Sequence, residues 1–150
     1  MTLMQPEPGE RAAFSAWRSI LEVHSALTRR LDAALQDRVD IPLAWYDVLV
    51  HVHEAPTGRI RLRSLEERVL MTQSTLSRVA TRMQVAGLLT RRVPADDRRA
   101  VEVRLTAAGT RRLQRAREVA IAELRQTIVT ALSEDEAHQL LRLLEKVRRR

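Results

Sequence analysis

The sequence of 150 residues contains no cysteine and only 4 glycines. Without thiols the chain can form neither disulfides nor thiolate zinc sites, and cysteine-based redox sensing is excluded. The scarcity of glycine leaves no phosphate-cradling loop, and neither a nucleophile elbow nor a Glu/His metal triad is present. His51 and His53 do not suggest a metal site, because residues two apart on a helix point to different faces. We therefore expect no enzymatic activity, no cofactor and no metal.

Long apolar runs are also missing from the sequence, and none could cross a bilayer. The first 30 residues carry Glu7, Glu10 and Glu22 and lack the apolar segment of a signal peptide. A length of 150 residues with 45% hydrophobic side chains suits one compact domain. We therefore expect a soluble, cytoplasmic protein without membrane contact.

Acidic side chains are outnumbered, with 19 against 26 basic ones and a formal net charge of +7. Such an excess of cations indicates an anionic partner, either nucleic acid or an anionic membrane. Lys146 is the sole lysine, and the planar fork of arginine suits phosphates and guanine edges. An arginine-rich genome would explain the same bias, so the arginine content alone is weak evidence for a nucleic-acid partner.

Apolar residues recur at three- and four-residue steps near both ends of the chain. This period predicts amphipathic helices over about 10–36 and 107–131, and a last helix that follows the capping box of Ser133 and Glu136. The apolar stripe on the first helix is broad enough to bury more than one face. We therefore expect this helix to contact a second copy of the chain as well as its own core.

The middle of the chain alternates between helical and strand periods. In chain order we expect a helix with Pro42 in its first turn, a short strand over 59–62, two short helices over 63–87 and a two-stranded hairpin over 88–106. Thr72 is placed to cap the second short helix, and Gly87 to end it. Helix, helix, tight turn, helix and hairpin is the order of a winged helix-turn-helix. The predicted fold class is therefore mainly α with a small β-hairpin wing.

In such a fold the helix after Thr72 would read DNA. Leu76, Val79 and Met83 would pack inward and leave a polar face outward. Short hydroxyls let the backbone approach phosphate, and glutamine and arginine pair bidentately with purine edges. The predicted DNA-contacting side chains of this helix are Gln73, Ser74, Thr75, Ser77, Arg78 and Arg82.

The turn of the hairpin is strongly charged. Arg98 and Arg99 carry guanidinium groups of the sort that insert into a narrow minor groove. Asp97 beside them could orient one arginine through a charge-assisted hydrogen bond. We therefore predict that Arg98 and Arg99 contact DNA and that Asp97 positions the wing. The other exposed arginines, such as Arg91 and Arg112, are expected to be mostly solvated.

The sequence resembles the multiple-antibiotic-resistance regulator (MarR) family over 45–49, 65–82, 87–91 and 97–109. The last stretch is the most specific. It matches the wing signature of the family, an Asp-x-Arg, then a Val-x-Leu-Thr, then a glycine three residues on. Taken with the order of the helices, the resemblance spans roughly residue 17 to the C-terminus.

One departure from the family pattern is Glu66, where a small alanine is usual. A carboxylate at this position must be exposed or paired, with Arg63 and Arg68 as candidate partners. The crossing of the two short helices could therefore differ slightly, without a change of fold.

The resemblance implies a homodimer whose first helix and last two helices interlace. The whole of 1–150 is then a single MarR-like domain, with dimerisation helices over 10–37 and 107–150 and a winged helix-turn-helix lobe over 43–105. Recognition helices would enter successive major grooves of a near-palindromic site, with half-sites roughly 34–36 Å apart and wings in flanking minor grooves.

The resemblance also implies a small-molecule pocket between the dimerisation helices and the DNA-binding lobe, often for phenolic or aromatic acids. Trp17, His24, Trp45 and His51 are the candidate lining residues. Simple core packing is the alternative explanation for each of them.

These observations predict a sequence-specific, homodimeric DNA-binding regulator, a repressor in preference to an activator, released by a small aromatic or phenolic effector. The alternative is a basic architectural protein that coats double-stranded DNA without sequence preference and responds to no ligand. A competition ratio between specific and non-specific DNA separates the two, whereas affinity alone does not.

Overall fold

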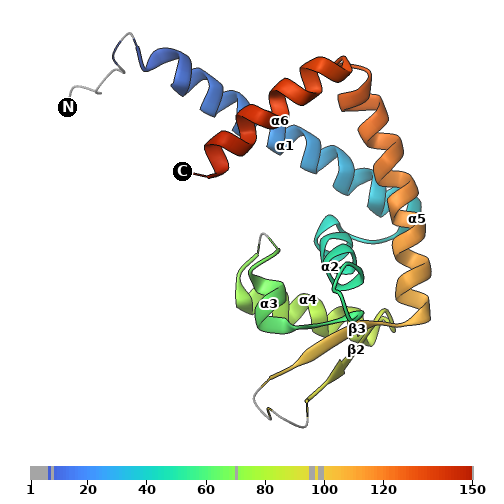
Figure 1. Cartoon of the computed structure of the whole chain (residues 1–150). Coiled ribbons are helices and arrows are strands. Elements are labelled where there is room, and N and C mark those ends of the chain that lie inside the picture. Colours follow the sequence, from blue (N-terminus) through green and yellow to red (C-terminus); the bar gives the residue numbers. More distant parts are fainter. Residues whose placement is uncertain (1–6, 8, 70, 95–96, 98–99, 150) are drawn as a thin grey trace, which may run out of the picture.

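The computed structural model describes residues 7, 9–69, 71–94, 97 and 100–149. The helices and strands are α1 (Arg11–Val39), α2 (Leu43–His53), β1 (Arg59–Arg61), α3 (Leu62–Glu66), α4 (Gln73–Val85), β2 (Leu89–Arg92), β3 (Glu102–Leu105), α5 (Ala107–Leu124), the π-helical segment η1 (Arg125–Val129) and α6 (Glu134–Arg148). Long helices from both ends of the chain form one part of the molecule, and α2 to β3 form a smaller lobe beneath them (Figure 1). The predicted fold class, mainly α with a small β wing, is confirmed.

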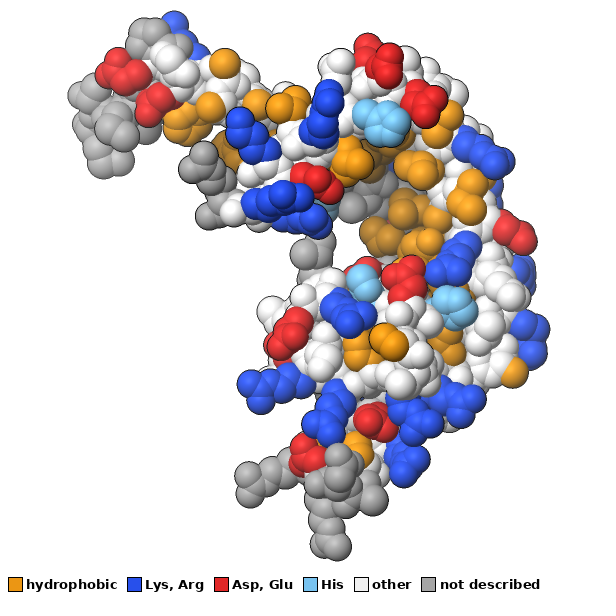
Figure 2. All heavy atoms as spheres, in the orientation of Figure 1, with side chains coloured by type: hydrophobic (Ala, Val, Ile, Leu, Met, Phe, Trp, Pro, Cys, Tyr) orange, Lys and Arg blue, Asp and Glu red, His pale blue; other side chains and the backbone are white. Residues whose placement is uncertain are grey.

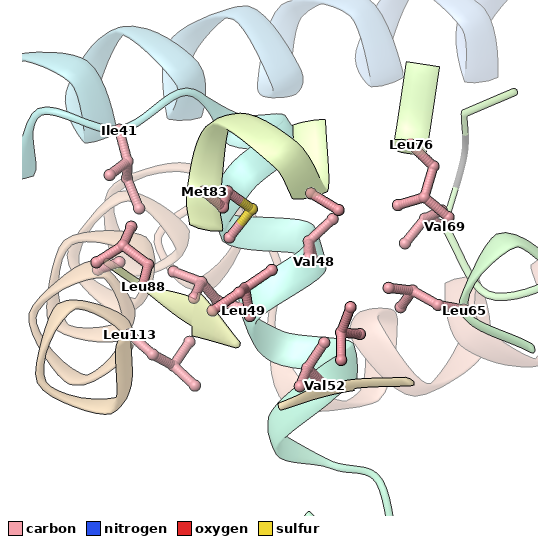
Figure 3. Close-up of a cluster of buried hydrophobic side chains, with 14 of the residues drawn as sticks. Ile41, Val48, Leu49, Val52, Leu65, Val69, Leu76, Met83, Leu88 and Leu113 are labelled. Carbon is pink, nitrogen blue, oxygen red and sulfur yellow. The ribbon is translucent and has the colours of Figure 1, made fainter. Parts of the chain in front are cut away.

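The lobe from α2 to β3 is built on a buried apolar cluster. Leu49 of α2, Leu65 of α3 and Leu76 of α4 are fully buried and belong to one core, together with Val103 of β3. Figure 3 shows these helices turning their apolar faces toward one another. Burial of each such side chain stabilises the fold by about 1.5–3 kcal/mol, so the faces of α2 and α4 are fixed relative to one another.

The wing is a three-stranded antiparallel sheet in the order β1-β3-β2. The sequence predicted a two-stranded hairpin and a separate short strand, and the structure joins them. Ile60 of β1 pairs with Val103 of β3, and both side chains are buried in the core. The additional strand anchors the base of the wing to the lobe.

Helix ends follow the local chemistry that the sequence predicts. The Thr72 hydroxyl accepts a hydrogen bond from the backbone N–H of Thr75 at the start of α4. The turn after α4 contains Gly87 at a φ of +73°, which a side chain would disfavour. Pro42 is the residue before α2 and lies outside its first turn, so that prediction was wrong by one position. The Asp32 carboxylate accepts from the Leu43 N–H at 2.7 Å and supplies the missing cap.

The long helix predicted over 107–131 changes character before its end. Regular α-helix stops at Leu124, and Arg125–Val129 form a π-helical turn. Such wide turns are rare and frequently lie at functional sites. In this protein the widened turn faces α1, because Gln126 within it accepts a hydrogen bond from Arg30 of α1.

Arg112 of α5 was expected to be solvated, and this expectation was wrong. Its guanidinium donates to the backbone carbonyls of Val39 and Asp40, at the C-terminal end of α1. A cation there satisfies carbonyls that have no partner within the helix and complements the helix dipole. The contact fixes the end of α1 against α5.

Candidate nucleic-acid interface

The outward face of α4 is polar and the opposite face is buried. Leu76, Ala80 and Met83 have no exposed surface. The side chains predicted to contact DNA divide into two groups: Gln73, Ser74, Arg78 and Arg82 are exposed, and Thr75 and Ser77 are half-buried. The Thr75 hydroxyl also accepts a hydrogen bond from the Thr72 hydroxyl at 3.0 Å, which occupies one of its lone pairs. The exposed group is thus the better placed for an incoming partner.

Arg78 and Arg82 lie one turn apart on α4 and are both exposed. None of the ion pairs within the described part of the chain involves either of them. Figure 2 shows cationic side chains spread over the lower lobe, with only a few acidic ones among them. The two exposed arginines of α4 therefore favour an anionic partner.

A hydrogen-bonded chain ties α4 to the wing. The Arg91 guanidinium of β2 donates to the Thr81 hydroxyl at 2.8 Å, and that hydroxyl donates to the Ser77 carbonyl at 2.9 Å. Arg91 was expected to be solvated, and its contact with Thr81 is the correction. The two elements that would touch DNA are thereby held in a fixed relation.

The tip of the wing is described only in part. Arg98 and Arg99, the predicted minor-groove contacts, lie outside the described residues. Asp97 is described, and one of its carboxylate oxygens lies 3.8 Å from the Arg61 guanidinium of β1. This ion pair links the tip of the wing to the strand at the other edge of the sheet.

The four residues predicted to line an effector pocket do not line a common cavity in the described part of the chain. Trp17 is 59% exposed near the start of α1. His24 lines an apolar groove between α1 and α6. Trp45 packs against the core. The Nε2 atom of His51 lies 3.4 Å from Oδ1 of Asp47, which is one turn earlier on α2.

A different cavity of about 300 Å³ lies where α1, α2 and α5 meet. Its lining residues are Leu27, Arg30, Leu31, Tyr46, Ala120, Ile121, Glu123, Leu124, Thr127 and Ile128. Burial raises the pKa of Tyr46; the nearby Arg117 opposes this and Glu54 adds to it. The Tyr46 phenol is therefore neutral at physiological pH.

The polar end of this cavity holds an ion pair in which only the carboxylate is buried. Arg30 Nε donates to Glu123 Oε2 at 2.7 Å, and Arg30 Nη2 donates to Gln126 Oε1 at 3.0 Å. Glu123 is only 8% exposed. Sequence reasoning missed this site, although a carboxylate within the apolar stripe of the helix after the wing was a signal that could have found it.

Glu66, the departure from the family pattern, is partly exposed on α3. None of the ion pairs among the described residues involves it. The adjacent Leu65 is fully buried, so α3 packs into the core with a glutamate at this position.

In the described part of the chain, every helix is too short or too polar to span a bilayer.

The lobe packs the apolar faces of α2, α3 and α4 together and leaves the polar face of α4 exposed. An antiparallel, arginine-containing wing follows these helices. This arrangement defines a winged helix-turn-helix protein.

Comparison with known proteins narrows this class. The sequence profile of the MarR family matches residues 39–100. The chain is 27% identical to the HTH-type transcriptional repressor IacR of Pseudomonas putida, over 85% of this chain and 74% of that protein. It is similar in structure to AbsC, a MarR family transcriptional regulator from Streptomyces coelicolor, with a TM-score of 0.85, 26% identity and coverage of 98% and 97% of the two chains. Sco3205, a MarR family regulator from the same organism solved in complex with DNA, gives a TM-score of 0.85 and 26% identity over 98% of this chain and 91% of that one. Residues 39–100 therefore match the MarR family, and the fold of the chain is similar to that of MarR family transcriptional regulators.

Proposed function

We propose that this protein is a homodimeric repressor that binds a near-palindromic DNA site through α4 and the wing. The exposed polar face of α4 carries the proposal: Gln73, Ser74, Arg78 and Arg82 project from a helix whose other face is locked into the core. Arginine and glutamine can read purine edges, and the serine hydroxyl suits a phosphate. A regulator of similar structure was solved with DNA, and a curated relative is a repressor.

A homodimer is supported by apolar surface that the single chain leaves open. No residue of α6 is buried, and Leu141 and Leu143 are more than half exposed. On α1, Phe14 and Trp17 are likewise more than half exposed. Exposed apolar side chains of the two helices, among them Ile20 and Leu144, also line a common groove, and such surface marks an interaction site. A second copy with the same surface would cover it symmetrically.

An effector is proposed to bind the cavity between α1, α2 and α5. At about 300 Å³ the cavity has the size of a small-molecule site and could hold a single ring. The cavity lies between α1 and α5, the helix that follows the wing. A ligand in this cavity that has different affinities for the free and the DNA-bound conformations would therefore change the affinity for DNA. The four residues first considered for this role are not part of the cavity, and Arg30, Tyr46 and Glu123 replace them in the proposal.

Selection of bound duplexes from a random DNA pool tests the proposed operator. We expect an inverted repeat with half-sites one helical turn apart, bound ~10³ times more tightly than scrambled DNA. Enrichment of no motif, with an affinity that follows salt alone, would instead establish the architectural alternative.

The substitution Arg78→Ala tests the role of α4 in that complex. We expect operator affinity to fall by about 1–3 kcal/mol, because a bidentate base contact is worth that much. Arg38→Ala is the matched control, since it removes an exposed arginine from the last turn of α1. Equal affinities of Arg78→Ala and Arg38→Ala for the selected operator would refute the assignment of α4.

A further inference from the structure

The cavity between α1, α2 and α5 has one polar end in an otherwise mostly apolar wall. Leucine, isoleucine and alanine side chains from α1, α5 and η1 form most of the lining. The polar groups are the Arg30–Glu123 ion pair, the Tyr46 phenol and the Thr127 hydroxyl. Thr127 already donates to the backbone carbonyl of Glu123 at 2.7 Å. The ion pair and Tyr46 are therefore the groups that would select a ligand.

The two members of the ion pair differ in their access to water. The Arg30 side chain is half exposed, whereas 11% of the Glu123 side chain is accessible. Water can screen the guanidinium, but the carboxylate lies in the low-dielectric wall of the cavity. Arg30 is the cation among the lining residues, and it already donates to both Glu123 and Gln126. A negative charge entering the cavity would therefore have to share this cation with Glu123.

Glu123 keeps acceptor capacity that a ligand can use. Arg30 Nε bonds Oε2, and none of the hydrogen bonds among the described residues involves Oε1. No buried side-chain nitrogen or oxygen atom of the described residues lacks a partner, so Oε1 is at least partly accessible. An ionised carboxylate accepts several hydrogen bonds and donates none. The polar end of the cavity therefore offers an acceptor to a ligand that carries a donor.

We infer that Glu123 makes this cavity selective for uncharged, single-ring ligands with a hydroxyl or N–H donor, and that it excludes the corresponding carboxylic acids. A neutral phenol can donate to Glu123 without disturbing the bond to Arg30. A benzoate would place a second carboxylate beside Glu123, at an ion pair that is already neutral, and would lose its hydration without a counterion of its own. A ligand ammonium would pair with Glu123 but would face the guanidinium of Arg30. The inference rests on the proposed effector function and narrows the chemical class of the effector.

The test compares 4-ethylphenol with 4-ethylbenzoate by titration calorimetry at pH 7, on the full-length protein without DNA. The two probes share a ring and an ethyl group and differ in charge, because a phenol titrates near 10 and a benzoate near 4, as tyrosine and acidic side chains do. We expect the phenol to bind the unmodified protein roughly tenfold or more tightly than the benzoate. Glu123→Gln removes the negative charge but keeps an oxygen for Arg30. We expect this substitution to reduce or invert the preference.

Glu118→Gln is the matched control, because Glu118 lies exposed on α5 and does not line the cavity. It should leave the preference unchanged. Preference of the unmodified protein for the benzoate, an unchanged ratio in Glu123→Gln, or millimolar or weaker binding of both probes would each overturn the inference. If Glu123→Gln does not fold, the ratio of the affinities of the unmodified protein for the two probes decides the test. Operator selection uses no ligand, so failure of DNA recognition and failure of the ligand selectivity are observed separately.

Discussion

At the scale of single residues, Gly109 has the most restricted environment among the described glycines. It is buried in the first turn of α5, and a Cβ at this position would overlap the backbone carbonyl of Leu88. Because the obstacle is backbone, a methyl group can be accommodated only if the start of α5 shifts away from Leu88, the residue before β2. We expect Gly109→Ala to lower the free energy of unfolding by about 1–3 kcal/mol, measured by urea denaturation.

Gly9→Ala is the matched control for this substitution, because no atom lies within 4 Å of the position that its Cβ would occupy. It should leave the denaturation midpoint nearly unchanged. If Gly109→Ala were as stable as Gly9→Ala, the close contact between the start of α5 and the Leu88 carbonyl would not exist in solution.

The same scale shows why sequence reasoning found some site residues and missed others. The polar face of α4 was predictable, because Leu76 and Met83 define the inner face and the helical period then assigns the outer one. The Arg30–Glu123 pair was not predictable from any local pattern, since 93 positions separate its members. A helical period shows which residues share a face, but it does not show which distant side chain a buried carboxylate will meet.

At the scale of whole elements, boundaries set by neighbouring residues were predicted better than pairings set by the tertiary fold. Thr72 and Ser133 cap α4 and α6 as predicted, because their hydrogen bonds span three residues. Pairing of β1 with β3 brings Ile60 to Val103, and nothing near Ile60 in the sequence specifies that partner. The π-helical turn at Arg125–Val129 was also missed, since the apolar period continues through it.

The capping box of α6 should make the stability of that helix depend on pH. Hydrogen bonds from the Ser133 hydroxyl and then from the Ser133 backbone N–H hold the pKa of Glu136 below its ordinary value of 4.5. A lowered pKa stabilises the folded state above the ordinary value, and this contribution is lost as the pH falls through the folded value. We expect Glu136→Gln to be less stable than the unmodified protein at pH 7, with the difference shrinking as the pH falls below the ordinary value of 4.5.

Thermal unfolding followed by circular dichroism from pH 7 to pH 3 measures this effect. Glu134→Gln is the control, because Glu134 is an exposed carboxylate of the same turn that lies outside the capping box. If both variants showed the same dependence on pH, the general charge of the turn would be responsible, and the specific bonds of Glu136 would not.

At the scale of the whole molecule, α6 buries too little surface in a single chain to be stable on its own. None of its residues is buried, and its apolar residues line an open groove with α1 of about 630 Å³. Isolated helices of its 15 residues are marginal in water. Packing against a second copy would supply the missing burial at about 25 cal/mol per Å² of apolar surface. The proposed dimer would therefore be coupled to the folding of its own interface, and its melting temperature should rise with protein concentration.

Leu143→Glu tests this coupling, because Leu143 lines the groove and is 63% exposed in the single chain. The substitution costs little in a monomer, but in the proposed dimer it would bury a carboxylate without a partner. We expect dimerisation, measured by sedimentation velocity, to weaken by about 3–5 kcal/mol, and binding to the selected operator to weaken with it. Gln139→Glu adds the same charge to an exposed position of α6 that does not line the groove, and it should remain dimeric. A Leu143→Glu protein that dimerises as strongly as Gln139→Glu would show that α6 is not part of the interface, and the second copy would then have to be sought on another surface.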